Sequence, residues 1–106
     1  MIGVMNNTKW DELRLAMYQL GALSPRWRTK DRQTGYISEW DGEWFYHFRC
    51  GGYDTIEWVE LKIESAPQRD SVREILRQVH VPGRETDAGF CVYGWVQAEK
   101  QVEYVG

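Results

Sequence analysis

The segment YISEWDGEWFYHFRC, residues 36–50, decides the predicted fold. Within it, Asp41-Gly42 separates two runs rich in aromatic residues. Asp-Gly is a strong hairpin signal, because a two-residue type I′ turn needs positive φ at both central positions. The segment therefore predicts two antiparallel strands, 36–40 and 43–50. In that register Trp40 faces Glu43, Ser38 faces Phe45 and Tyr36 faces His47.

This register divides the hairpin into two faces, because paired residues share a face. The more apolar face is expected to meet helices, and it carries Ile37, Glu39, Trp44, Tyr46, Phe48 and Cys50. The other face carries Tyr36, Ser38, Trp40, Glu43, Phe45, His47 and Arg49. A register slip of one residue would exchange the two faces.

Two helices and two further strands follow from apolar spacing. Residues 8–21 place Trp10, Leu13, Met17 and Leu20 on one helical face after a Thr8 cap, and residues 65–80 place Val72, Ile75, Leu76 and Val79 on another. Residues 55–64 alternate as a strand, with Trp58 opposite Val59 and Leu61, and residues 90–96 form the next strand. We expect an α+β fold, with an antiparallel sheet of four strands and two helices packed on one face. The order is α-β-β-β-α-β, with a fifth strand if residues 102–105 form one.

The length of 106 residues fits a single domain, residues 1–106. Residues 1–7 are expected to be frayed, and either Met1 or Met5 suits as the start. Residues 22–35 show no periodicity and are expected to form a long basic loop. Loops of that length are uncommon in small domains and are often functional or mobile.

The net charge is −3, and the charges are unevenly distributed. Acidic residues outnumber basic ones between residues 39 and 64, whereas residues 26–32 are mainly basic. This balance argues against general nucleic-acid binding and allows a basic partner. No signal-peptide pattern or membrane-length apolar run stands out, so we expect a cytoplasmic protein whose two cysteines are reduced.

Two groups of residues are candidates for binding. The first is the aromatic and acidic sheet face left uncovered by the helices, because exposed apolar patches usually mark partner sites. It comprises Tyr36, Trp40, Glu43, Phe45, His47 and Trp58. The chain's own basic loop or a second copy could cover this face instead. The second group is Arg26, Trp27 and Arg28 in the basic loop.

Catalysis is considered around His47, which lies near Asp41 and Glu43 in sequence. A histidine beside carboxylates can act as a general base or a metal ligand. However, Cys50 is three residues away on the same predicted strand and points to the opposite face, and no Cys or His pair has metal-ligand spacing. The sequence therefore predicts no catalytic residue, no metal and no cofactor.

The runs NNTKW (6–10), GYISEWDGEWFYHF (35–48), HVPG (80–83) and VYGW (92–95) resemble a family of small, uncharacterised bacterial proteins of about this length. The resemblance extends over nearly the whole chain. It implies a bacterial, cytosolic, stand-alone domain and carries no established activity.

Three functions compete at this point. The first is a non-catalytic protein-binding module, like bacterial immunity or inhibitor proteins, with a basic partner or a second copy on the aromatic-acidic face. The second is a binder of nucleic acid or a small ligand through the Arg/Trp loop. The third is an enzyme around His47.

Overall fold

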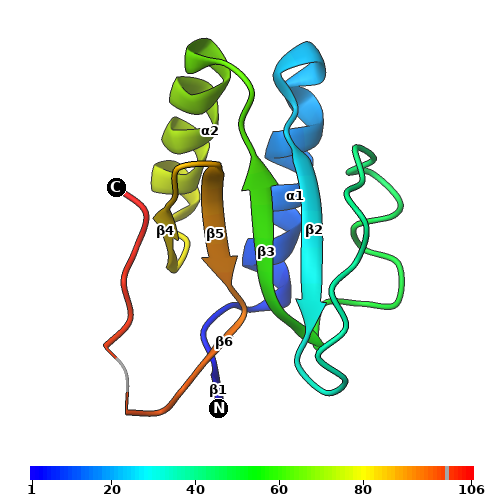
Figure 1. Cartoon of the computed structure of the whole chain (residues 1–106), viewed down its shortest axis with the longest axis vertical. Coiled ribbons are helices and arrows are strands. Elements are labelled where there is room, and N and C mark those ends of the chain that lie inside the picture. Colours follow the sequence, from blue (N-terminus) through cyan, green and yellow to red (C-terminus); the bar gives the residue numbers. More distant parts are fainter. Residues whose placement is uncertain (100) are drawn as a thin grey trace.

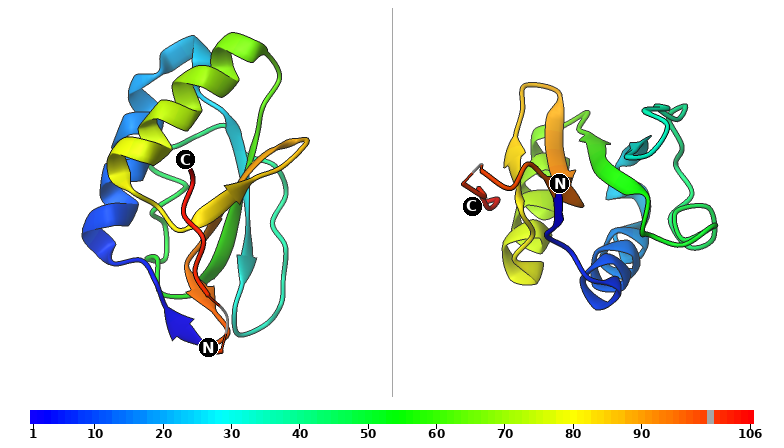
Figure 2. Two further views of the ribbon diagram at one scale, coloured as in Figure 1. Left: turned by 90° about the vertical axis from the view of Figure 1, so that its left-hand side faces the viewer. Right: turned by 90° about the horizontal axis from the view of Figure 1, so that it is seen from below.

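The computed structural model describes residues 1–99 and 101–106. Its centre is a four-stranded antiparallel sheet in the order β2-β3-β5-β4, and two helices cover one face of it (Figures 1 and 2). The predicted α+β class, the four-stranded antiparallel sheet and the helix pair are confirmed. The main elements are α1 (Asn7–Gln19), β2 (Arg26–Asp31), β3 (Ile56–Lys62), α2 (Ala66–Val79), β4 (Gly83–Glu85) and β5 (Gly89–Tyr93).

Both helices bury the faces that the sequence predicts. On α1, Trp10, Leu13 and Met17 are buried, and on α2, Val72 and Leu76 are buried. The predicted N-cap of α1, Thr8, is wrong. The side chain of Asn6 accepts the backbone N–H of Lys9 at 2.8 Å, so Asn6 rather than Thr8 caps α1.

The strand over β3 is also confirmed, since Val59 and Leu61 are buried while Trp58 and Glu60 lie on the opposite face. The predicted strand 90–96, in contrast, divides at Gly94. After it, β6 (Trp95–Val96) leaves the sheet and pairs with β1 (Ile2–Gly3), so residues 2–3 are paired rather than frayed.

Two further differences concern short segments. Residues 102–105 contribute a single bridge, between Tyr104 and Pro82, rather than a strand, and β4 was not predicted. A 3-10 turn, η1 (Gly21–Leu23), links α1 to the start of β2. No helix within the described residues is long and apolar enough to cross a membrane.

The predicted hairpin at Asp41-Gly42 is wrong. Residues 36–41 instead run along the outer edge of β2, where Trp27 and Asp41 exchange backbone hydrogen bonds of 2.8 and 2.9 Å. The chain reverses earlier, between Asp31 and Gly35. There the Asp31 carboxylate accepts the N–H groups of Gln33 and Thr34 at 2.8 and 2.9 Å. The predicted basic loop, residues 22–35, therefore contains strand β2.

The residues after Gly42 form consecutive turns rather than a strand. The Glu43 carboxylate accepts the backbone N–H groups of Phe45, Tyr46 and His47, which satisfies the start of these turns. Four-residue spacing then puts Trp44 and Phe48 on the same side. Both are buried, with ring centroids 4.7 Å apart. The aromatic run thus builds one end of the core beside α1.

Candidate functional site

The predicted binding residues do not form one surface, because the hairpin that would align them does not exist. Trp27 is only 6% exposed and its indole Nε1 donates to the backbone oxygen of Glu43 at 3.1 Å. Arg26, next to it, is exposed at the start of β2. The Glu43 carboxylate is occupied by backbone N–H groups. Trp27 and Glu43 therefore hold the fold together.

The other aromatic residues of the predicted face lie apart from one another. Tyr36 is 66% exposed beside the 31–35 turn. Phe45 packs beside α1, with its ring centroid 5.2 Å from that of Tyr18. Trp40 lies under the guanidinium of Arg28, 4.6 Å from the ring centroid. The predicted partner surface is thus dispersed over three places.

His47 contacts Asp41 on the surface, with Nδ1 2.9 Å from Oδ2. Partial burial would raise the pKa of Asp41, but the Glu43 N–H and the His47 ring together hold it below its usual value. Within residues 1–99 and 101–106, no three His, Cys, Asp or Glu residues are grouped so that they could hold a metal ion. This pair fastens the 43–50 turns to the end of the edge segment 36–41.

The sheet face opposite the helices brings a different set of residues together. Strand register aligns Lys30, Trp58 and Tyr93 in one row across β2, β3 and β5. The next row contains Arg28, Glu60, Cys91 and Arg84, across all four strands. Of the predicted binding residues, only Arg28 and Trp58 lie in these rows.

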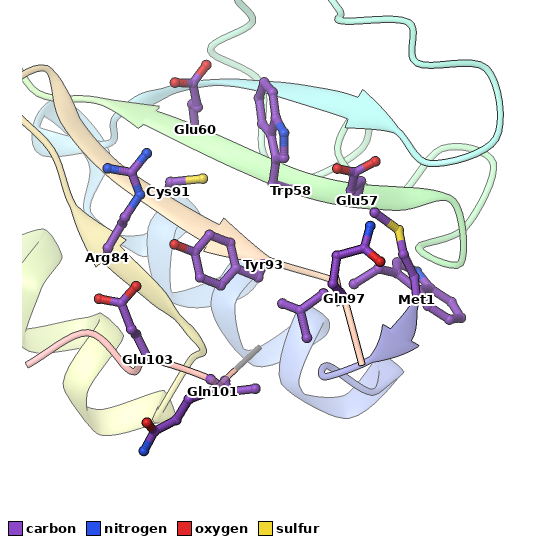
Figure 3. A pocket seen from close by; sticks show the side chains of 13 residues that line it. Met1, Glu57, Trp58, Glu60, Arg84, Cys91, Tyr93, Gln97, Gln101 and Glu103 are labelled. Atoms are coloured by element: carbon purple, nitrogen blue, oxygen red, sulfur yellow. The ribbon is translucent and has the colours of Figure 1, made fainter. Parts of the chain in front are cut away.

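A groove of about 490 Å³ opens over these rows (Figure 3). Cys91 forms its floor, because this small side chain stands between the longer side chains of Glu60 and Arg84. Trp58 and Tyr93 are direct cross-strand neighbours at one side of the floor. The site is therefore a shallow hollow with two aromatic rings beside it.

The C-terminal segment supplies the opposite wall, which includes Glu103. The backbone oxygen of Glu103 accepts the N–H of Gly83 at 3.0 Å, and Tyr104 stacks on His80 with ring centroids 4.3 Å apart. Val105 is buried in the core. Three consecutive residues thus fix this wall against the start of β4 and the end of α2.

A family model matches residues 1–99 of the chain. The chain belongs to DUF6678, a family of unknown function. The resemblance to an uncharacterised family is thereby confirmed. No curated protein and no solved structure matches the chain.

The groove of this DUF6678 member has an acidic lining. Its lining contains one guanidinium, that of Arg84, and three carboxylates, those of Glu57, Glu60 and Glu103. Residues of β2 pair with two of these carboxylates from outside the groove. Arg28 Nε is 2.7 Å from Glu60 Oε1, and Lys30 Nζ is 3.7 Å from Glu57 Oε2.

The floor of the groove is uncharged at neutral pH. Burial and, to a smaller extent, the nearby Glu60 raise the pKa of the Cys91 thiol to about 11, while Arg84 opposes this shift. The thiol therefore stays protonated and behaves as a small, nearly apolar surface. This arrangement suits binding by shape and charge, since a protonated thiol is a weak nucleophile.

Sequence reasoning missed Cys91, Tyr93, Arg84 and Glu103 as site residues. Alternation in the predicted strand 90–96 places Cys91 and Tyr93 on one face, so this part of the signal was present. Arg84 and Glu103 carry no such signal, because β4 is very short and the C-terminal segment is irregular. Only the folded chain brings them to the groove.

Proposed function

We propose that this DUF6678 member is a non-catalytic protein-binding module that receives a basic segment of a partner on the open face of its sheet. The observation that carries the proposal is the groove, in which two aromatic rings and three carboxylates stand together on a face that the helices leave free. An inhibitor of a basic protein, in the manner of an immunity protein, would use such a face.

Trp58 and Tyr93 are the expected anchors. Both are half-buried, so a partner can cover the remaining ring surface without first rearranging the chain. Their strands lie in the middle of the sheet, which holds the rings in fixed positions. Buried aromatic anchors surrounded by polar groups are typical of the centre of a protein interface.

The carboxylates would guide a basic partner to this face. Glu57 and Glu60 stand on β3, Glu103 stands on the C-terminal wall, and the whole chain carries a net charge of −3. Complementary charge speeds association and rejects partners of the wrong sign. Both effects weaken with added salt, because exposed charges are screened.

Neither alternative function gains a supporting observation. A nucleic-acid site in the 26–28 segment would need the indole of Trp27, which lies in the core, and Arg28 is already paired with Glu60. An enzyme around His47 would need a cleft there, whereas the His47–Asp41 pair lies outside the groove.

We propose the bacterial cytosol as the setting. Cys50 and Cys91 are both free thiols, and Cys50 is exposed. An exposed thiol is more stable in a reducing compartment, where it is not driven into disulfides.

Nuclear magnetic resonance titration tests the proposed docking. The probe is a lysine- and arginine-rich peptide, and a glutamate-rich peptide of equal length is its control. We expect the basic peptide alone to shift the amide signals around Trp58 and Tyr93, with smaller shifts at higher salt. Equal responses to both peptides, or shifts confined to other faces, would contradict the proposal.

A matched pair of variants locates the contact on the protein. Trp58→Leu removes an aromatic ring beside the groove, and Tyr36→Ser removes an exposed ring elsewhere. We expect Trp58→Leu to weaken peptide binding about tenfold and Tyr36→Ser to leave it unchanged.

A further inference from the structure

We infer that the groove binds one arginine side chain of the basic segment, with its guanidinium over Cys91 and beside the rings of Trp58 and Tyr93. This inference rests on the proposed docking function and specifies the group that is recognised. Glu60 and Glu103 are the expected acceptors for its N–H groups.

The available space fits a flat group at the end of a long side chain. Along its row, Cys91 is flanked by Glu60 and Arg84, so the hollow exists only because a small residue stands between two long ones. The floor is neutral and only 7% exposed, so a planar group can lie over it without displacing a charge. A guanidinium is planar, whereas an ammonium is a compact, strongly hydrated charge.

Aromatic rings around the sheet already hold cations: Trp40 and Trp95 each carry a guanidinium, and Trp40 also carries the Lys62 ammonium at 5.6 Å. Arg28 lies over the ring of Trp40 at 4.6 Å, and Arg32 lies over the ring of Trp95 at 3.9 Å. Among the described residues, no cation lies over the ring of Trp58 or of Tyr93 in this way. These two rings therefore offer unused faces for a guanidinium supplied by a partner.

The Glu60 and Glu103 carboxylates can accept hydrogen bonds from the partner's guanidinium. Glu60 bonds Arg28 through Oε1, which leaves Oε2 for a second donor, and the Glu60 side chain is 32% exposed. Glu103 lies across the groove floor on the other wall (Figure 3). Arg84 is the direct cross-strand neighbour of Cys91, so its guanidinium stands beside the floor, and its repulsion limits the site to one added cation rather than several.

Three short alanine-based peptides that differ only at the central residue test this inference. The residue is arginine, lysine or citrulline, and citrulline has nearly the shape of arginine without its charge. The readout is the shift of the Trp58 indole N–H signal during nuclear magnetic resonance titration. We expect arginine to bind most tightly, lysine more weakly, and citrulline at least about tenfold more weakly than arginine.

Protein variants then assign the contacts. Glu103→Gln keeps the shape of an exposed side chain and removes its charge. It should weaken binding of the arginine peptide about threefold to tenfold and leave binding of the citrulline peptide unchanged. Cys91→Leu fills the hollow above the floor and should abolish the difference in affinity between the peptides, whereas Cys91→Ala should retain that difference. Glu103→Gln does not depend on repacking of the buried strand, so it remains informative if Cys91→Leu fails to fold.

The outcomes separate the inference from the proposed function. If the lysine- and arginine-rich peptide binds this face but citrulline equals arginine, or Glu103→Gln changes nothing, the arginine site is overturned and the docking function stands. If the basic peptide does not bind this face at all, both are overturned. Arginine preference that shrinks in Glu103→Gln and disappears in Cys91→Leu supports both.

Discussion

The guanidinium of Arg14 on α1 donates from Nη1 to the backbone oxygen of Phe45 at 2.6 Å, and Arg14 is only 6% exposed. Its Nε also reaches the carboxylate of Asp11 at 3.4 Å. One buried charge thus ties the first helix to the turns that follow Gly42. The position of the aromatic segment depends on this contact as much as on its own local bonds.

Arg14→Leu should destabilise the fold by about 2–3 kcal/mol, because the Phe45 oxygen and Asp11 both lose a charged donor. Urea unfolding measures the change in the free energy of unfolding. Arg49→Leu is the matched control, since Arg49 is exposed and should alter that free energy by less than about 0.5 kcal/mol. Equal effects would mean that the Arg14 contact contributes nothing.

Glu43→Ala should lower the thermal midpoint and make the 43–50 turns exchange their amide hydrogens faster. The N–H of His47, followed by those of Tyr46 and Phe45, lowers the pKa of Glu43. A carboxyl with a lowered pKa in the folded state stabilises the fold above its unfolded pKa and loses that contribution as pH falls through its folded pKa.

The wild-type chain should therefore lose part of its stability below about pH 4.5, and Glu43→Ala should lose less. Comparing thermal midpoints at neutral and acidic pH measures this difference. Glu39→Ala, an exposed acid in the same segment, is the control. If both variants follow wild type at every pH, Glu43 does not cap the turns.

Gly94→Ala and Gly42→Ala test the corrected topology. A Cβ at Gly94 would lie 2.0 Å from the backbone oxygen of Ile56, so the alanine should cost about 3 kcal/mol or more. Gly42 has open space around it and is not among the residues with positive φ. Gly42→Ala should thus be nearly neutral, whereas a type I′ hairpin turn there would make it clearly destabilising. Urea unfolding of both variants distinguishes the observed chain path from a hairpin turn at Gly42.

The two thiols should differ in reactivity. Cys50 is exposed and Cys91 is buried, with its thiol pKa raised by burial to about 11. Because the thiolate is the reactive form, an aromatic disulfide reagent should label Cys50 rapidly at neutral pH and Cys91 only after unfolding. Mass spectrometry assigns each label, and the Cys50→Ser variant should show only the slow reaction. Rapid labelling of Cys91 would contradict its burial in the sheet.

The helices and β3 were predictable because their signals are local. Trp10, Leu13 and Met17 recur at helical spacing, and the alternation around Val59 marks a strand whatever its neighbours are. The hairpin failed because Trp44 and Phe48 are four residues apart. That spacing suits consecutive turns as well as alternate positions on a strand, and Asp41 serves as a cap rather than as a hairpin residue.

The groove could not be predicted, because it depends on pairings between distant residues. Trp58 meets Tyr93, and Cys91 meets both Glu60 and Arg84, only through the register of β3, β4 and β5. Sequence spacing contains no information on which strands are neighbours. Of the residues expected on the aromatic and acidic sheet face, only Trp58 lines the groove.

The segments that flank the sheet also limit how the molecule can associate. Residues 36–41 follow the outer side of β2, and residues 103–105 follow the start of β4. Exposed strand edges are the usual templates for sheet extension and amyloid-like growth. Because the chain itself pairs along β2 and at the start of β4, these stretches of the sheet border are not open to strand addition by a visiting peptide.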